Sequence, residues 1–255
     1  MALDDYVVTP DVERAVGQGI LQESADKNCE LGTELVLNDG RKFRYCLNGS
    51  GTLAAGKICD SRTWVANAGA GSAEANDAVN TAAAGATKVT VTTTGIVIAN
   101  EYADGYLAVV DGSGATAGGE GQILKIKSHP AATAGATCVI TLYDPIRAAF
   151  HADTTVSLVH NPYSGVVISV ASGGTEVGTE VGVPLIPVTA AYFFWAQFKG
   201  LSNVLIDGTP AIGTPLMRGS VAGSLALADS SFKEVATMHH TGVNTEYRPV
   251  ILDIP

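Results

Sequence analysis

The sequence predicts an all-β fold, a multi-stranded antiparallel β-barrel or sandwich with an extended N-terminal arm and a hairpin region. Twenty-nine glycines and ten prolines are spread along the 255 residues, which suits many short strands and turns and suits long helices poorly. Between these turn residues, β-branched and aromatic residues alternate with polar ones, as expected of strands with one buried face. The densest aromatic run, at 192–198, lies in a chain that is only 6% aromatic, so we expect it to nucleate the core.

The first 30 residues are expected to form an N-terminal arm. Thr9-Pro10 has the pattern of a helix start, an N-cap residue followed by proline, but the periodicity is lost by Gly17. A segment this polar is expected to be floppy alone and to become ordered on a partner. We therefore predict that residues 1–30 attach the chain to another protein.

Residues 31–86 are expected to form a β-hairpin region followed by a linker. From Leu31 the apolar residues recur with a period of two, and Asn38-Asp39-Gly40 separates two such runs. This turn is the strongest hairpin signal in the chain. Residues 66–86 are rich in alanine, glycine and asparagine, which is typical of a linker or domain boundary.

Residues 87–255 are expected to form one C-terminal β domain. Most of its predicted strands are short, alternating and bounded by glycine, proline, asparagine or aspartate. The predicted strands are 87–98, 106–110, 123–127, 138–142, 156–159, 166–170, 214–227, 235–241 and 250–254, together with two strands formed by the aromatic run and the segment 204–206.

Charge and hydropathy argue against several classes of partner. The net charge is −10, from 15 basic and 25 acidic residues, and no cluster of Lys and Arg suits phosphate binding. We therefore expect no contact with nucleic acid or with a membrane surface. No apolar run approaches the roughly 20 residues needed to span a bilayer. The acidic N-terminus lacks the basic start of a signal peptide, so we expect the protein to be made and folded in a cytoplasm.

The low charged fraction, 16%, indicates a surface that is partly covered. Soluble domains carry about 25% charged residues. We therefore expect contact with a partner protein or with copies of the same chain.

No motif in the sequence indicates a metal, a cofactor or catalysis. The four cysteines lack the paired spacing of a zinc site, so buried free thiols are expected, although Cys46 and Cys59 could face each other across a hairpin. His239 and His240 are adjacent in a predicted strand and would point to opposite faces. The glycine-rich loop 111–121 leads into a strand, where a phosphate loop would lead into a helix. There is no nucleophile-elbow motif and no triad context, so we predict that the protein is not an enzyme.

Several segments resemble structural proteins of tailed-bacteriophage virions, described as head decoration or cement proteins. The similar segments include LNDGRKFRYCLNGSGTLAAGK at 37–57, the block EYADGYLAVVDGSGATAGGEGQILKIKSH at 101–129, YFFWAQFKGLSNVLIDGTPAIGTPL at 192–216 and TGVNTEYRPVILDI at 241–254. The resemblance covers most of residues 31–254, and its motifs are structural. In decoration proteins generally, subunits lie on the outside of the shell, often as trimers, and brace the expanded lattice.

The resemblance implies a virion protein on the capsid exterior, made in the cytoplasm of an infected bacterium. Its implied partners are the major capsid protein and copies of itself in a homotrimer. Two alternatives stay open: a tail-tube or fibre component, and a carbohydrate-binding β-sandwich whose exposed aromatic residues stack on sugars. Four side chains of the aromatic run are expected to pack in the core or between subunits: Tyr192, Phe194, Trp195 and Phe198.

Overall fold

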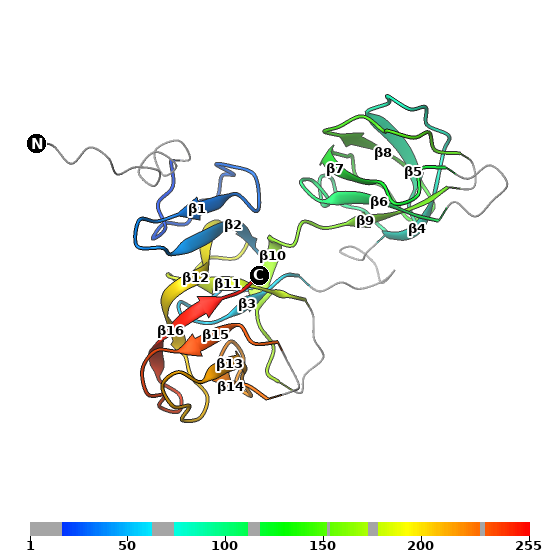
Figure 1. Ribbon diagram of the computed structural model, residues 1–255. Coiled ribbons are helices and arrows are strands. Elements are labelled where there is room, and N and C mark those ends of the chain that lie inside the picture. Colours follow the sequence, from blue (N-terminus) through cyan, green and yellow to red (C-terminus); the bar gives the residue numbers. More distant parts are fainter. Residues whose placement is uncertain (1–16, 63–73, 112–117, 152–153, 173–177, 230–232) are drawn as a thin grey trace, which may run out of the picture. The chain divides into compact units, whose positions relative to one another are not determined.

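The computed structural model confirms the all-β prediction. It describes residues 17–62, 74–111, 118–151, 154–172, 178–229 and 233–255, which contain sixteen strands and no helix. The chain divides into two compact units (Figure 1). The first unit is Met1–Thr63 with Pro162–Pro255, and the second is Trp64–Asn161.

This division differs from the predicted domains 1–30, 31–86 and 87–255. The second unit is an insertion in the first, because β10 (Ser164–Ile168) pairs with both β2 (Lys42–Asn48) and β3 (Cys59–Asp60). A continuous domain from residue 87 to the C-terminus therefore does not exist. The alanine-rich segment predicted as a linker contains β4 (Glu74–Val79), a strand of the second unit.

The prediction of a separate arm is wrong for the part that is described, residues 17–30. The Gln18 side chain is buried, and its Nε2 donates a hydrogen bond to the backbone oxygen of Phe193 over 2.9 Å. Tyr45 Oη donates to Gln18 Oε1 over 2.9 Å, and Trp195 Nε1 donates to the Gln18 carbonyl over 3.0 Å. These bonds satisfy the polar groups of a segment whose polarity otherwise suggested disorder. Ser24 also forms a two-bond bridge with Phe193.

The first unit is built on one ten-stranded sheet. Its order is β1 (Glu34–Val36), β2, β10, β3, β11 (Glu180–Pro184), β12 (Phe193–Leu205), β16 (Tyr247–Asp253), β15 (Ala236–Met238), β13 (Pro215–Arg218) and β14 (Leu225–Leu227). Because β2 also pairs with β12, the strands β2, β10, β3, β11 and β12 form a closed ring. The β2–β10 pair is parallel and the other pairs are antiparallel.

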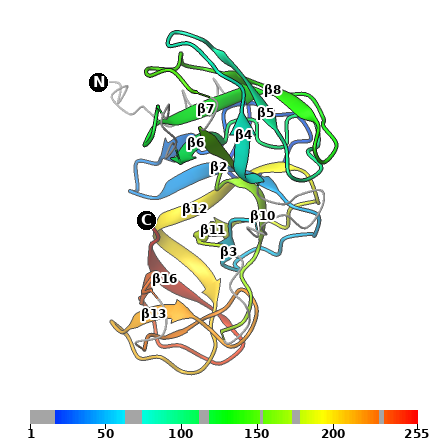
Figure 2. The ribbon, with the colours of Figure 1, turned by 90° about the vertical axis from the view of Figure 1, so that its right-hand side faces the viewer.

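Strand β12 connects the two halves of this sheet. Its first half pairs with β2 and its second half pairs with β16, and the change of partner occurs at Lys199. Figure 2 shows β12, in yellow, passing from β2 toward β16. Gly200 lies at this change with φ 89°, and a Cβ there would lie 3.1 Å from the Cα of Arg41. A side chain at residue 200 would therefore disturb the crossing.

The hydrophobic core of the first unit consists of three clusters, and β12 contributes to each. Successive side chains of a strand point to opposite faces. Trp195 therefore packs with Tyr45 in one cluster while Phe194 packs in another, and Phe198 belongs to the third. The rings of Tyr45 and Trp195 meet edge to face with centroids 5.0 Å apart, a favoured aromatic geometry.

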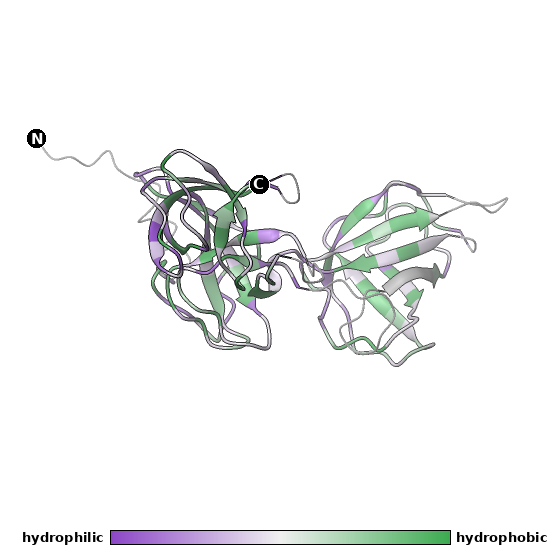
Figure 3. Cartoon of the chain, turned by 90° about the horizontal axis from the view of Figure 1, so that it is seen from below, coloured by the Kyte–Doolittle hydropathy of each residue, from purple (hydrophilic) through white to green (hydrophobic). Residues whose placement is uncertain are grey.

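The second unit is a closed six-stranded antiparallel barrel. The strand order is β4, β5 (Lys88–Thr92), β8 (Thr137–Leu142), β7 (Ile123–Ser128), β6 (Tyr106–Asp111) and β9 (Thr155–Val159). Inward residues such as Val89, Leu107 and Ile140 alternate with outward ones and fill the interior. Figure 3 shows hydrophobic segments, in green, on the strands of both units.

Replacing Gln18 with alanine should destabilise the first unit by about 1–3 kcal/mol, because the Tyr45 hydroxyl and the Phe193 carbonyl would lose buried partners. Urea unfolding followed by tryptophan fluorescence measures this loss. Gln22→Ala is the matched control, since Gln22 is exposed, and it should change stability by less than about 0.5 kcal/mol. Equal midpoints for the two variants would contradict the role assigned to Gln18.

Candidate functional site: an exposed apolar sheet face

The structure places three of the four predicted packing residues in the core of the first unit. Phe194 and Trp195 are each 1% exposed and Phe198 is 6% exposed, whereas Tyr192 is half-buried against the cluster that holds Phe194. All four residues pack in, or against, hydrophobic clusters formed within the single chain. A surface for a partner would therefore consist of other, exposed residues.

The cysteines are free, and three of the four are buried. Burial raises the pKa of the Cys46 and Cys59 thiols far above the ordinary value. Both groups are therefore protonated at neutral pH, which makes them poor nucleophiles and poor metal ligands. Within the described residues, no group of three or more His, Cys, Asp or Glu is arranged to hold a metal ion. His239 and His240 are exposed.

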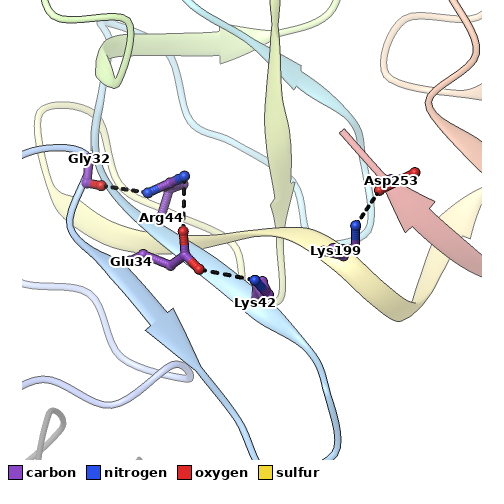
Figure 4. Close-up of polar contacts among 6 residues, drawn as sticks. All are labelled: Gly32, Glu34, Lys42, Arg44, Lys199 and Asp253. Atoms are coloured by element: carbon purple, nitrogen blue, oxygen red, sulfur yellow. Dashed lines mark hydrogen bonds and ion pairs between the residues drawn. The ribbon is translucent and has the colours of Figure 1, made fainter. Parts of the chain in front are cut away.

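Basic side chains of the first unit are paired with carboxylates. On β1 and β2, Glu34 accepts from Lys42 Nζ over 3.3 Å and from Arg44 Nη2 over 3.0 Å, and Arg44 Nη1 also donates to the Gly32 carbonyl (Figure 4). The Arg44 guanidinium lies 4.8 Å from the ring centroid of Phe198. Glu34 offsets one of the two positive charges in this cluster.

A second ionic group is buried. Arg218 Nη2 lies 3.0 Å from Asp60 Oδ2 and 3.2 Å from Glu180 Oε1, and the Arg218 and Asp60 side chains are almost completely shielded from solvent. The three residues belong to β13, β3 and β11. Their position in the interior gives this group a structural role in joining three strands.

The outward face of the β12–β16 pair is apolar and exposed. Leu201 and Ile251 are directly opposite each other and are 51% and 44% exposed. The next outward residues along β16 are Pro249 and Tyr247, and Tyr247 is 44% exposed. We call Leu201, Ile251, Pro249 and Tyr247 the β16 face. An antiparallel sheet normally presents polar residues to water, so three apolar residues along β16 with Leu201 beside them on β12 indicate a contact surface, in which the exposed Asn203 opposite Pro249 is the polar member.

The β16 face has an ion pair at one end. Lys199 Nζ lies 2.8 Å from Asp253 Oδ1, in the row beyond Leu201 and Ile251 (Figure 4). Both side chains are substantially exposed, so the pair contributes little to stability. It forms a polar rim beside the apolar residues, an arrangement that is common in protein interfaces.

The other end of the β16 face opens into a cavity of about 440 Å³. Tyr247 and Asn203 line it from the sheet, Ala55 and Gly56 from a loop, and Pro184 and Leu185 from the end of β11. Gly56 has φ 71°, and a Cβ there would lie 2.7 Å from two carbons of the Tyr247 ring. The ring therefore rests directly on the glycine backbone. A cavity of this size accommodates a bulky apolar side chain or a small ligand.

The alternation of residues in the terminal strand indicates the β16 face. Val250, Leu252 and Ile254 alternate inward, which places Ile251 and Pro249 outward and apolar where polar residues are the rule. Leu201 is likewise an exposed apolar residue, between Gly200, which has a positive φ, and the buried Ser202. The described residues of the β16 face thus combine exposed apolar side chains with one ion pair at the end of the strand pair.

Comparisons with protein-family models, with curated proteins and with solved structures found no match to this chain. Its described residues contain no helix long and apolar enough to cross a membrane. Function is therefore inferred from the motifs of the sequence and from the β16 face.

Gly56→Ala should destabilise the first unit by about 1–2 kcal/mol, because a residue with a Cβ is strained at this positive φ and because Tyr247 would have to move. Thermal unfolding measures the change. Gly40→Ala is the matched control, since Gly40 also has a positive φ, 86°, and nothing lies within 4 Å of a Cβ built there. If both variants unfold at the same temperature, Tyr247 is not held against Gly56.

Proposed function

We propose that this chain is a non-catalytic structural protein of a tailed-bacteriophage virion that decorates the outside of the capsid by binding the major capsid protein. The sequence motifs that resemble decoration proteins support the class of protein. The β16 face is the observation that carries the binding role, because it offers exposed apolar residues on a rigid sheet with a polar rim.

The physical chemistry of the β16 face suits protein binding. Fully burying a Leu or Ile side chain contributes about 1.5–3 kcal/mol, and aromatic side chains that fill pockets dominate many interfaces. Leu201, Ile251 and Tyr247 together provide such a centre. The net charge of −10 also suits the exterior of a DNA-filled shell better than its interior, where the chain would face phosphates.

Self-association into a homotrimer is part of the proposal. Light scattering behind a sizing column should give 78.3 kDa, which is three times the 26.1 kDa subunit mass. A mass of one subunit would contradict a preformed trimer and would defer assembly to the capsid surface. Rings or elongated, detergent-resistant trimers would instead indicate the tail-tube or fibre alternative.

Capsid binding is tested with expanded shells of the phage that encodes the chain. The wild-type protein should sediment with these shells and raise the temperature at which they rupture, because opening the shell would also expose the buried interface. The double variant Leu201→Glu with Ile251→Glu should bind at least about tenfold more weakly, since two charges would be buried without partners.

Ile123→Glu is the matched control for this experiment. Ile123 is 64% exposed on β7 of the barrel, so its replacement adds a charge outside the β16 face. Equal binding by the double variant and the control would remove the β16 face from the interface. Equal rupture temperatures with and without the wild-type protein would exclude a stabilising role.

A carbohydrate-binding role is the second candidate, and Tyr247 is the observation that favours it. The exposed Tyr247 ring and the Asn203 amide line the same cavity, and sugars are commonly bound by an aromatic face together with hydrogen-bonding side chains. A glycan array with the wild-type chain and with Tyr247→Ala separates the two functions. Hits that Tyr247→Ala abolishes would favour sugar binding, and an array without hits would exclude it.

A further inference from the structure

The barrel of the second unit consists of two copies of one three-stranded unit. Exchanging β4, β5 and β6 for β7, β8 and β9 leaves every strand neighbour in the barrel unchanged. The sequences agree at the turns that lead into β5 and β8. AAAGATKV at 82–89 and ATAGATCV at 132–139 are identical at six of eight positions.

The backbone hydrogen bonds repeat in the same way. Gly85 N donates to the Ile146 carbonyl over 2.8 Å, and Gly135 N donates to the Thr93 carbonyl over 2.8 Å. The bridge between Ala82 and Phe150 corresponds to the bridge between Ala132 and Val97. The two ends of the barrel therefore have equivalent positions that can be compared directly.

One end departs from this symmetry by four added residues. The Gly105 amide donates to the Tyr102 carbonyl, and at the twin end the Thr154 amide donates to the His151 carbonyl, both over 3.0 Å. In these matched contacts Val97 corresponds to Phe150 and Tyr102 corresponds to His151. Tyr102 is five positions after Val97, whereas His151 directly follows Phe150, so four residues are added here. The added residues, 98–101, include Asn100 in a left-handed conformation with φ 59° and the buried carboxylate of Glu101.

His129 holds the added segment against the barrel. His129 lies six residues before the turn glycine Gly135, as Val79 lies six residues before Gly85, and both side chains are buried. The Tyr102 amide donates to His129 Nε2 over 2.9 Å, and His129 Nδ1 lies 2.9 Å from the Pro130 carbonyl, to which it donates. The bond from Tyr102 requires an unprotonated Nε2, so the closed segment contains a neutral imidazole.

His160 and Glu101 complete the cluster. His160 Nε2 lies 3.4 Å from Glu101 Oε1, and Glu101 Oε2 accepts from the Ile98 amide over 3.0 Å. The Tyr102 ring lies beside both imidazoles, with centroids 4.2 Å from His160 and 5.7 Å from His129. Two imidazoles and one carboxylate thus surround a buried aromatic ring.

We propose that residues 98–104 form an acid-sensitive closure of one barrel end, which His129 holds shut while neutral and releases when protonated. A proton on Nε2 would face the Tyr102 amide, so two donors would meet and the hydrogen bond would be lost. The Glu101 carboxylate faces both imidazoles and can offset only one added positive charge at a time. Protonation of His129 therefore requires more free energy in the closed form than in the open form.

The other groups near His129 agree with a pKa of this side chain that is lower in the closed form. Burial lowers the pKa of His129, and the hydrogen bond to Pro130 and the charge of Glu101 oppose that shift only in part. Cys138 Sγ contacts the same Pro130 carbonyl. Asp104, which accepts from Tyr143 Oη over 3.4 Å, and Lys125, over the Tyr143 ring, belong to the same barrel end.

The sign of the pH dependence follows from linkage. A histidine whose pKa is lowered by closure stabilises the closed form fully above the ordinary value of about 6.5. This stability is lost as the pH falls below that value toward the lowered pKa. At pH 5.5, one unit below it, the closed form should be weakened by up to about tenfold.

Hydrogen exchange of the full chain at pH 7.0 and pH 5.5 tests the closure. After correction for the intrinsic exchange rate, the protection of the Tyr102 amide should fall by up to about tenfold between these values. The amides of Ile146 and Phe150 at the twin end, which donate to the Ala86 and Ala82 carbonyls, should keep their protection. Equal changes at the two ends would overturn the proposal.

Two variants sharpen the result. His129→Gln keeps an acceptor for the Tyr102 amide and cannot titrate, so protection should persist and lose its pH dependence. His129→Val copies the twin position and removes the acceptor, so the Tyr102 amide should be poorly protected at both pH values. An unchanged pH dependence in His129→Gln would overturn the proposal. The wild-type comparison between the two ends remains decisive if either variant fails to fold.

Discussion

The pairing of β2 with β12 is the contact on which the first unit depends. It joins Tyr45 to Trp195, 150 positions later in the chain, with the whole barrel inserted between them. Closing so long a loop costs conformational entropy before any contact compensates for it. The edge-to-face packing of the two rings and the hydrogen bonds that both rings donate to Gln18 provide that compensation, since they bury large apolar surfaces while satisfying the polar atoms of both rings.

The two units use buried polar groups in different ways. In the first, Arg218 pairs with Asp60 and Glu180 and so joins three strands. In the second, the closed segment beside Tyr102 contains a neutral histidine whose charge state can change near physiological pH. The ion pairs hold one arrangement of strands, whereas a titrating group makes the arrangement conditional. The β16 face is formed by other residues, so the proposed binding and the proposed pH response use different residues.

Local signals in the sequence predicted the local structure well. The Asn38-Asp39-Gly40 turn connects β1 and β2 as expected, with Gly40 at φ 86°. The aromatic run forms the first half of β12, but the prediction of a second, separate strand at 204–206 is wrong, because β12 continues as one strand through Gly200 to Leu205. The insertion could not be predicted, because the parallel pairing of β2 with β10 depends on contacts between distant segments that leave no trace in composition. The arm was mispredicted because the polarity of residues 17–30 is satisfied by partners such as Phe193, far along the chain. The repeat at 82–89 and 132–139 was visible in the sequence and would have located the barrel.

The duplicated barrel has a consequence for the history of the chain. A single three-stranded copy has two unpaired edges and only half of the interior, so it could close only against another copy. An ancestor of that kind would have been a two-chain barrel whose existence depended on protein concentration. Fusion of two such copies would have removed that dependence and freed each half to diverge. The four residues added at one end are a change that a symmetric pair of identical chains could not have made on one side alone.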